Sequence, residues 1–148
     1  MNNQVQAELK KIFNGRFSTS ESTRANYARG EDTYDPVLSK AVVFPETNEE
    51  VSKILSLCNE HKIPVVPFGT GTSLEGNVVG NDKGITISLE KMNKILSVNA
   101  EDFDCRVQAC VTKEQLNEYL REDGVFFPID PGANAAIGGM ASTSASGT

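Results

Sequence analysis

The residues best suited to chemistry in this sequence form a loop of glycines and hydroxyl side chains. The segment PVVPFGTGTSLEGN, residues 64–77, sends a short apolar run directly into a tract of Gly, Thr and Ser. Glycine lets backbone N–H groups approach an anion closely, and Thr and Ser add hydroxyl donors. Ligands of open parallel sheets bind at the carboxyl ends of strands. The pattern predicts a phosphate-binding loop, and the alternative is a flexible connection.

Two familiar nucleotide motifs fit this loop poorly. A Walker A loop has the glycine spacing of Gly71 and Gly76, but Asn77 stands where that motif needs its lysine, so ATP or GTP hydrolysis is not supported. The Rossmann fingerprint fails at its third glycine, where Leu74 stands, and no helical pattern follows to supply an N-terminal dipole. Glu90 has the spacing of the ribose-binding acid, so a Rossmann site stays open as the weaker alternative.

The elements that would position the loop follow a strand–helix–strand pattern. Residues 41–44 are an apolar run, and residues 47–50, Thr-Asn-Glu-Glu, have the form of a capping box. A helix is expected to continue to about Lys62, and residues 65–68 form a second apolar run. The helical stripe consists of Val51, Ile54, Leu55 and Cys58. Such a unit predicts two parallel strands, and residues 85–89 are a third strand candidate after a long irregular loop.

The second half of the chain has a different pattern. Residues 95–98 and 103–111 alternate as antiparallel strands do when one face is solvated. Residues 112–115 form another capping box, and the expected helix ends at Gly124. Its apolar face consists of Leu116, Tyr119 and Leu120.

These patterns predict an α+β fold in which a small parallel α/β subdomain, βαβ-β, precedes the start of a mixed or antiparallel subdomain. Residues 4–13 are expected to form a first helix, and residues 16–39 an extended lead-in. The predicted divisions are an N-terminal helix and lead-in over 1–38, a first subdomain over 39–93 and the start of a second subdomain over 94–148.

Composition narrows the classes of partner. The chain has 148 residues, a net charge of −6 and no block of basic residues, which argues against nucleic acid and anionic membranes. It lacks an apolar run of the roughly 20 residues that a transmembrane helix requires. The N-terminus lacks the pattern of a secretory signal, so we expect a cytoplasmic protein. The cysteines Cys58, Cys105 and Cys110 are odd in number and have no C-x-x-C spacing, which favours free buried thiols.

Two segments carry a more specific resemblance. The sequence VVFPETNEEVSKILSLCNEHKIPVVPFGTGTSLEGN, followed by FFPIDPGANAAIGGMASTSASGT, resembles the FAD-linked oxidase family. That family includes D-lactate dehydrogenase of the cytochrome type, the glycolate oxidase flavin subunit, alkylglycerone-phosphate synthase and vanillyl-alcohol oxidase. The match runs from about residue 24 to the end. The resemblance implies a domain of two subdomains, one small and parallel and one with antiparallel strands, with FAD between them.

The resemblance also implies which residues hold the cofactor. The FAD pyrophosphate would be wrapped by Pro67, Gly69, Thr70, Gly71, Thr72, Ser73 and Leu74. The flavin side would be met by Pro131, Gly132 and Ala133. The following loop would contribute Gly138, Gly139, Ser142, Thr143 and Ser146. Some relatives attach the flavin covalently through a histidine, and Thr72 stands at that position, so noncovalent FAD is implied.

The implied activity is that of a flavin-dependent oxidoreductase that converts a D-2-hydroxy acid, of the D-lactate or glycolate type, to the 2-oxo acid. The alternatives are a flavoprotein like UDP-N-acetylenolpyruvoylglucosamine reductase and a noncatalytic truncated module. The resemblance places the substrate site, the catalytic base and any metal ligands outside residues 1–148, so we assign no catalytic residue and no metal ligand here. We expect an N-terminal fragment, inactive alone, whose small hydroxy acid substrate binds only in the longer protein. The electron acceptor is left open.

Isolated polar residues offer no further site. His61 is expected at the end of a surface helix, and the arginines Arg24, Arg29 and Arg106 are expected on the surface. Cys110 stands where many relatives have glycine, and its small side chain is expected to fit the local turn. No set of His, Arg and carboxylate forms a base with an anion clamp.

Overall fold

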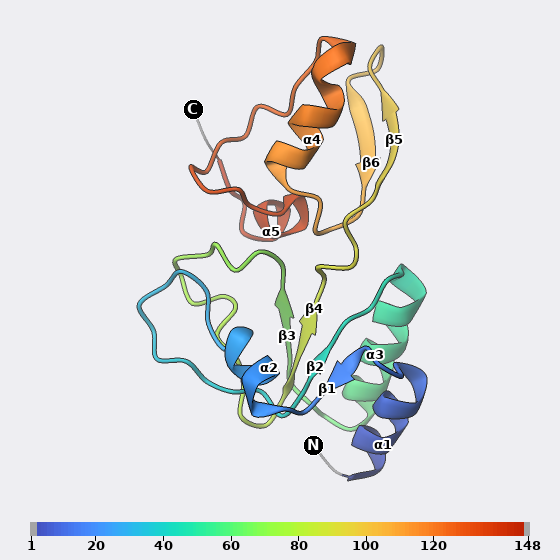
Figure 1. Cartoon of the computed structure of the whole chain (residues 1–148), viewed down its shortest axis with the longest axis vertical. Helices are drawn as coiled ribbons and strands as arrows, with labels where there is room; N and C mark the ends of the chain where they lie inside the picture. The colour runs from blue at the N-terminus through green and yellow to red at the C-terminus, as the bar shows by residue number, and fades with distance from the viewer. Residues whose placement is uncertain (1–2, 147–148) are drawn as a thin grey trace. The chain divides into compact units, whose positions relative to one another are not determined.

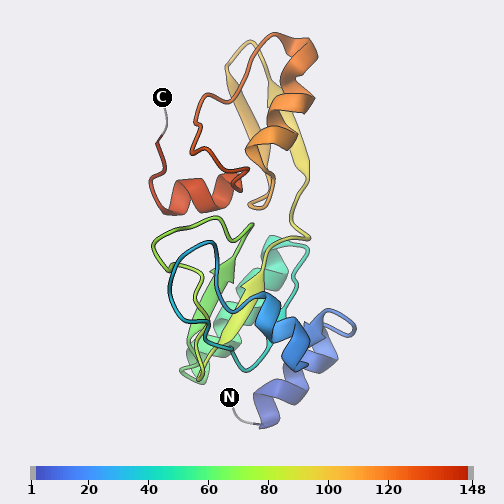
Figure 2. The ribbon, with the colours of Figure 1, turned by 60° about the vertical axis from the view of Figure 1, so that its left-hand side comes forward.

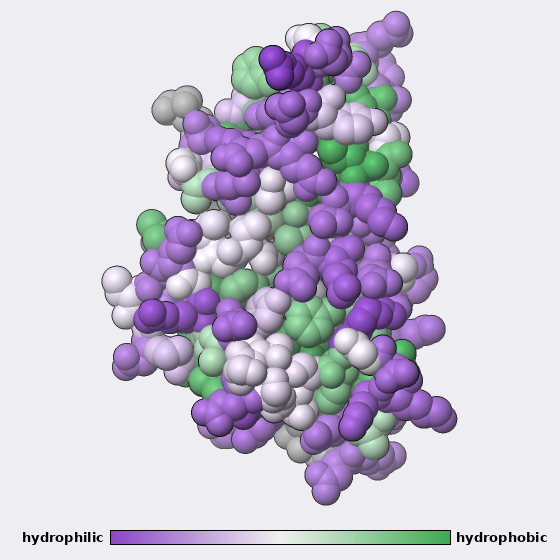
Figure 3. Space-filling view, in the orientation of Figure 1, coloured by the Kyte–Doolittle hydropathy of each residue, from purple (hydrophilic) through white to green (hydrophobic). Residues whose placement is uncertain are grey.

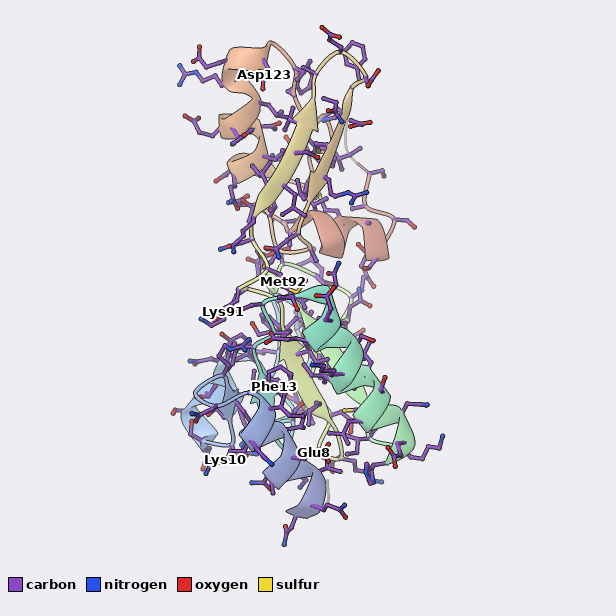
Figure 4. The ribbon with its side chains drawn as sticks, turned by 90° about the vertical axis from the view of Figure 1, so that its right-hand side faces the viewer. Glu8, Lys10, Phe13, Lys91, Met92 and Asp123 are labelled. Carbon is purple, nitrogen blue, oxygen red and sulfur yellow. The ribbon has the colours of Figure 1, made fainter. Side chains whose placement is uncertain are left out.

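The structure, a computed structural model, describes residues 3–146 and divides into two compact units. The first unit is Met1–Lys91 and the second is Met92–Thr148. Figure 4 labels Lys91 and Met92, the residues on either side of this division. Helices and two separate sheets make the fold α+β, as predicted (Figure 1).

A four-stranded sheet with the order β1-β2-β4-β3 forms the centre of the first unit. Its strands are β1 Phe17–Ser18, β2 Val42–Val43, β3 Val65–Phe68 and β4 Ile85–Ser88. Both β2 and β3 run parallel to β4, which confirms the predicted direction of the strand–helix–strand unit. However, β4 lies between them, so these two strands are not neighbours. β1 pairs antiparallel with β2 at the edge.

Three helices accompany this sheet, α1 Asn3–Ile12, α2 Glu21–Asn26 and α3 Asn48–Glu60. α1 and α3 pack on one face, and α2 lies on the other side (Figures 1 and 2). The apolar core lies between the sheet and helices α1 and α3. It consists of Val5, Leu9, Phe13, Ala41, Val43, Ile54, Cys58, Ile63, Ile85 and Ile87. Figure 4 labels Phe13 at the end of α1, where the chain turns toward the sheet. The N-terminal helix therefore completes the core of this unit.

The prediction of an extended lead-in over residues 16–39 was wrong in two places. β1 pairs with β2 through only two residues, and α2 has no buried residue, so neither element leaves an apolar pattern in the sequence. α2 begins because the Ser20 side chain accepts a hydrogen bond from the Thr23 N–H at 3.3 Å. Local capping, rather than burial, defines this short helix.

α3 confirms the capping signal and narrows the predicted stripe. The Thr47 hydroxyl accepts the Glu50 N–H at 3.2 Å, as expected of an N-cap. The Glu50 carboxylate accepts the N–H of Glu46, at 2.7 Å. Ile54 and Cys58 are buried, but Leu55 is 46% exposed, so its place in the core-facing stripe was predicted wrongly.

One ion pair links the segment after α1 to the first turn of α3. The Arg16 guanidinium donates to both oxygens of Glu50, each at 2.6 Å, and also to the Phe44 carbonyl at 3.2 Å. Both charged side chains are largely buried. The hydrogen bond from Arg16 lowers the pKa of Glu50 from 4.5 to about 2. The pair fixes the chain after α1 to the first turn of α3.

The second unit is a β-hairpin with two helices, β5 Ile95–Asn99, β6 Asp104–Val107, α4 Lys113–Leu120 and α5 Ile137–Ser142. The predicted antiparallel pairing is confirmed, although β6 ends well before residue 111. Val111, Leu116 and Leu120 form its small core. The short 3₁₀ turn η1, Arg121–Asp123, follows α4, and Gly124 ends it with a positive φ of 69°.

Two predictions for the second unit were wrong. Tyr119 is 59% exposed, so it does not belong to the apolar face of α4. The small-residue tract, predicted as a loop, forms α5 because Met140 anchors it in the interior. Small residues rarely signal a helix because they carry little apolar surface to define a stripe.

Hydrophilic residues cover most of the face seen in Figure 3, with smaller hydrophobic patches among them. Over residues 3–146, no helix combines the length and the apolar character needed to cross a bilayer.

The Arg16–Glu50 pair predicts an acid-sensitive contribution to stability. A carboxylate whose pKa is lowered on folding stabilises the protein above its unfolded pKa and loses that contribution as the pH falls. We therefore expect the free energy of unfolding to fall between pH 4.5 and about 2, measured by urea denaturation at each pH.

The Glu50→Gln variant should lose about 1–3 kcal/mol at neutral pH, because it removes the charge that pairs with both nitrogens of the largely buried Arg16 guanidinium. Only Glu46, 3.7 Å from Arg16 Nη1, then remains as a charged partner. Its stability should also vary less across the acid range. Glu60→Gln, at an exposed carboxylate of the same helix, is the control. An equal acid dependence in the wild type and Glu50→Gln would contradict this role for the pair.

Candidate functional site

The predicted phosphate loop begins where β3 ends, at the carboxyl end of a parallel strand. β3 and β4 stay paired through Phe68 and Ser88, and the Leu89 N–H then donates to the Phe68 carbonyl at 2.9 Å. From Gly69 to Gly84 the chain forms no helix or strand, as predicted (Figure 2). The sheet therefore holds the start of the loop, and the loop itself forms no strand pairing.

The loop leaves a row of backbone donors without partners. Within residues 3–146, none of the backbone N–H groups of residues 69–74 donates a hydrogen bond to another residue. Successive free N–H groups on a glycine-rich loop can form an anion-binding nest. This segment of backbone is therefore suited to a phosphate group.

Carbonyl and side-chain contacts hold the loop in this conformation. The Gly71 carbonyl accepts the Glu31 N–H at 2.9 Å. Gly71 is buried and has a positive φ of 76°, which glycine adopts without strain. The Asn77 amide donates to the Ser73 hydroxyl at 2.9 Å. These contacts hold the middle of residues 69–74 and the part that follows it.

The side chains of the loop divide into inner and outer positions. Phe68 is buried beneath Gly71, while Pro67, Thr70 and Leu74 are exposed. Thr70 and Thr72 place their hydroxyl oxygens 3.4 Å apart. Leu74 is 68% exposed. The hydroxyl donors expected from the sequence thus lie beside the free N–H groups.

The predicted flavin-side segment lies in the second unit. Gly132 has a positive φ of 83°, and its N–H donates to an Asp130 carboxylate oxygen at 3.1 Å. Asp130 also accepts from the Lys113 ammonium at 2.7 Å, and this hydrogen bond lowers the pKa of Asp130. Pro131 is exposed and Ala133 is partly buried. The turn is therefore tied to the start of α4.

The third predicted group lies on or after α5. Gly138 donates its N–H to the Ala109 carbonyl at 2.8 Å. Ser142 and Thr143 donate their hydroxyl hydrogens to carbonyls four residues earlier, at 2.7 and 3.0 Å. Their hydroxyl donors are therefore engaged within the helix. Gly139 and Ser146 are exposed.

The structure thus gathers the predicted residues into separate groups. Those of residues 67–74 share one loop of the first unit, and those of residues 131–146 belong to the second unit. The stretch from residue 28 to 34 was missed by the sequence patterns, although Glu31 holds Gly71. Its only signal is Gly30, and a single glycine in a polar stretch does not reveal a tertiary contact.

Other candidate residues have structural surroundings. His61 caps the end of α3, as expected. Arg24 is not a plain surface residue, because its Nη1 donates to the Ser39 carbonyl at 3.2 Å and its Nε is buried. Cys58 and Cys110 are buried, but Cys105 is exposed, which corrects the expectation for that thiol. Over residues 3–146, no group of three or more His, Cys, Asp or Glu is arranged to hold a metal ion.

A parallel α/β unit with a glycine-rich loop at a strand end, followed by an antiparallel unit, is the two-part arrangement that the family resemblance implied. The FAD binding domain family matches residues 39–148, and the chain belongs to this family.

Curated relatives agree with the family. The chain is 44% identical over 131 residues to a probable mitochondrial D-lactate dehydrogenase of Danio rerio, and the match covers 88% of this chain and 26% of that protein. It is 39% identical over 144 residues to the mitochondrial D-lactate dehydrogenase (cytochrome) of Arabidopsis thaliana, covering 96% of this chain and 25% of that protein. A glycolate oxidase subunit of Bacillus subtilis is 31% identical over 125 residues, with coverages of 83% and 27%. The chain spans about a quarter of the length of these relatives.

Solved structures show the same fold at low identity. An alkyldihydroxyacetonephosphate synthase superposes with a TM-score of 0.89 at 22% identity, covering 99% of this chain and 33% of that one. A variant of the BBE-like 1 protein of Physcomitrella patens superposes with a TM-score of 0.75 at 22% identity, covering 90% of this chain and 30% of that one. This likeness supports the two-part fold.

Substitutions at two glycines with nearly the same φ would test how tightly the loop packs on Phe68. Gly15 and Gly71 have φ values of 75° and 76°, but a Cβ at Gly15 would meet open space, whereas a Cβ at Gly71 would lie 2.8 Å from Phe68. Gly15→Ala should cost about 1–2 kcal/mol through backbone strain alone. Gly71→Ala should cost more in urea denaturation, because it adds the clash with Phe68. Equal losses of stability in the two variants would show that the Phe68 ring can move aside at little cost.

Proposed function

We propose that this chain is the FAD-binding part of a flavin-dependent oxidoreductase that oxidises a D-2-hydroxy acid, of the D-lactate or glycolate type, to the 2-oxo acid. The observation that carries the proposal is the row of free backbone N–H groups over residues 69–74 at the carboxyl end of β3. The relatives named D-lactate dehydrogenase and glycolate oxidase subunit support the substrate class.

The loop suits the pyrophosphate of FAD for a chemical reason. The chain has a net charge of −6 and no lysine or arginine within residues 64–77, so neutral donors must provide the stabilisation of the anion. Backbone N–H groups and the hydroxyls of Thr70, Thr72 and Ser73 are such donors. The residues proposed to hold the pyrophosphate are Pro67, Gly69, Thr70, Gly71, Thr72, Ser73 and Leu74.

The second unit would contribute the remaining cofactor contacts. These residues are Pro131, Gly132, Ala133, Gly138, Gly139, Ser142, Thr143 and Ser146. Asp130 and Lys113 would act indirectly, because their ion pair holds the Gly132 turn. Ser142 and Thr143 offer oxygen lone pairs as they stand, and would have to release their carbonyl partners to donate to a ligand.

The flavin supplies the oxidising chemistry when it is bound, since it can accept a hydride equivalent from the α-carbon of the hydroxy acid. The proposed role of this chain is to bind and orient the cofactor. Noncovalent attachment is proposed because Thr72 stands where covalent relatives have a histidine. The cytoplasmic location stays a prediction, which cell fractionation would test.

A titration of the purified chain with FAD, followed by flavin absorbance, tests cofactor binding. Thr70 is exposed, so a substitution there leaves the core intact. Thr70→Asp should weaken FAD binding at least about tenfold relative to Thr70→Asn, because the two side chains have the same size and differ in charge.

Saturable binding by the chain, with that order of affinities, is the expected result. Equal affinities for the two variants would contradict pyrophosphate binding at this loop. If the chain alone does not bind FAD, the same pair of variants should be compared in a polypeptide of the relatives' length that contains this sequence. Absence of binding there too would refute the assignment.

The substrate class is tested in the longer polypeptide with bound flavin. Anaerobic addition of D-lactate or glycolate should bleach the flavin absorbance, because the hydroxy acid gives up two electrons. L-lactate is the control for stereochemistry. Bleaching by neither D-lactate nor glycolate would contradict the proposed substrates while leaving FAD binding intact.

A further inference from the structure

A turn outside the family match lies directly against the proposed phosphate loop. The family match begins at residue 39, whereas the turn is formed by residues 30–34. Figures 1 and 2 both show the segment after α2 running beside the loop that follows β3. Its Glu31 N–H donates to the Gly71 carbonyl at 2.9 Å.

The two backbones approach so closely that the turn needs a glycine. A Cβ at Gly30 would clash with the Gly71 carbonyl oxygen and would lie 2.8 Å from Cγ2 of Val78. Neither neighbour can move easily, because one is main chain and the other is buried at 8% exposure. The Gly30 requirement is therefore one of space, since its φ is not in the positive range.

Asp32 closes this turn. Its side chain is buried, with the residue only 7% exposed. One carboxylate oxygen accepts the Gly30 N–H at 3.2 Å, and the other accepts the Tyr34 N–H at 3.0 Å. The carboxylate thus bridges both sides of Glu31, so the direction of the Glu31 N–H depends on it.

The hydrogen bond to Gly71 has a consequence for the next residue. A peptide unit is planar, and in the trans form its C=O and N–H point in opposite directions. No cis peptide bond occurs in the described chain. Holding the Gly71 carbonyl toward Glu31 therefore turns the Thr72 N–H away from the turn, and that N–H has no acceptor within residues 3–146.

We propose that Asp32 is a positioning residue for cofactor binding, acting through the Glu31–Gly71 hydrogen bond to hold the Thr72 N–H ready for a phosphate oxygen. This inference rests on the proposed function of the loop. It adds a support from the N-terminal segment, which lies outside the family match.

The test compares Asp32→Ala and Asp32→Asn by two measurements. Hydrogen exchange at the Glu31 amide of the FAD-free chain reports whether its hydrogen bond to the Gly71 carbonyl stays formed. FAD titration, in the shortest polypeptide that binds it, reports affinity. Asp32→Ala should speed exchange at the Glu31 amide and weaken FAD binding about tenfold. Asp32→Asn keeps one acceptor oxygen and should fall between Asp32→Ala and the wild type.

Ile54→Val is the matched control, because Ile54 is fully buried in the same unit but belongs to the α3 core. It lowers stability without touching the turn, so it should leave exchange at the Glu31 amide and FAD affinity unchanged. If Asp32→Ala does not fold, Gly30→Ala serves as the second variant, since it forces the turn and loop apart.

The outcomes separate this inference from the proposed function. Wild-type exchange and affinity in Asp32→Ala would overturn it, and so would weaker FAD binding with unchanged exchange, because Asp32 would then act by another route. If no wild-type polypeptide binds FAD, the proposed function fails. Unchanged exchange at the Glu31 amide of the FAD-free variant would still overturn the support of the loop by Asp32, and faster exchange at that amide would support it.

Discussion

A row of backbone N–H groups that find no acceptor among the described residues is the constraint on which the first unit depends. Residues 69–74 give up the hydrogen bonds that a strand or helix would provide. Such a segment keeps one conformation only if its neighbours hold it. Here the β3–β4 pairing holds one end, the Ser73–Asn77 contact holds the other, and the Glu31 N–H holds the middle. The donors can then stay free without the loop losing its order.

The order of the strands explains why the loop sits where it does. β4 lies between β2 and β3 in the sheet, although it comes after both in the sequence. The connection through α3 therefore skips one strand position. β3 becomes an edge strand in this sheet, and its carboxyl end is not enclosed by a further strand. The edge position leaves room for an irregular loop of fifteen or so residues, which is unusual unless the loop has a function.

The sequence predicted the elements that have strong periodic or capping signals. α3 and α4 were found because Thr47 and Thr112 cap them and buried residues recur at helical spacing. It failed where structure depends on distant contacts. β1 is a strand only through its pairing with two residues of β2. α5 depends on the burial of Met140, and its local sequence does not reveal that burial. Leu55 and Tyr119 failed for a related reason, since helical spacing identifies a face but not its width.

The site was predictable to the same extent. Glycines and hydroxyl residues after a strand indicated the loop directly, because that chemistry is local. The support by Gly30 and Asp32 was invisible, because it requires knowing that residues forty positions apart share a backbone contact. The family match has the same boundary, since it begins after this support. Val5, Leu9 and Phe13 also precede the match, yet all three lie fully buried in the core. The family match therefore leaves out the first part of the unit that folds around the loop.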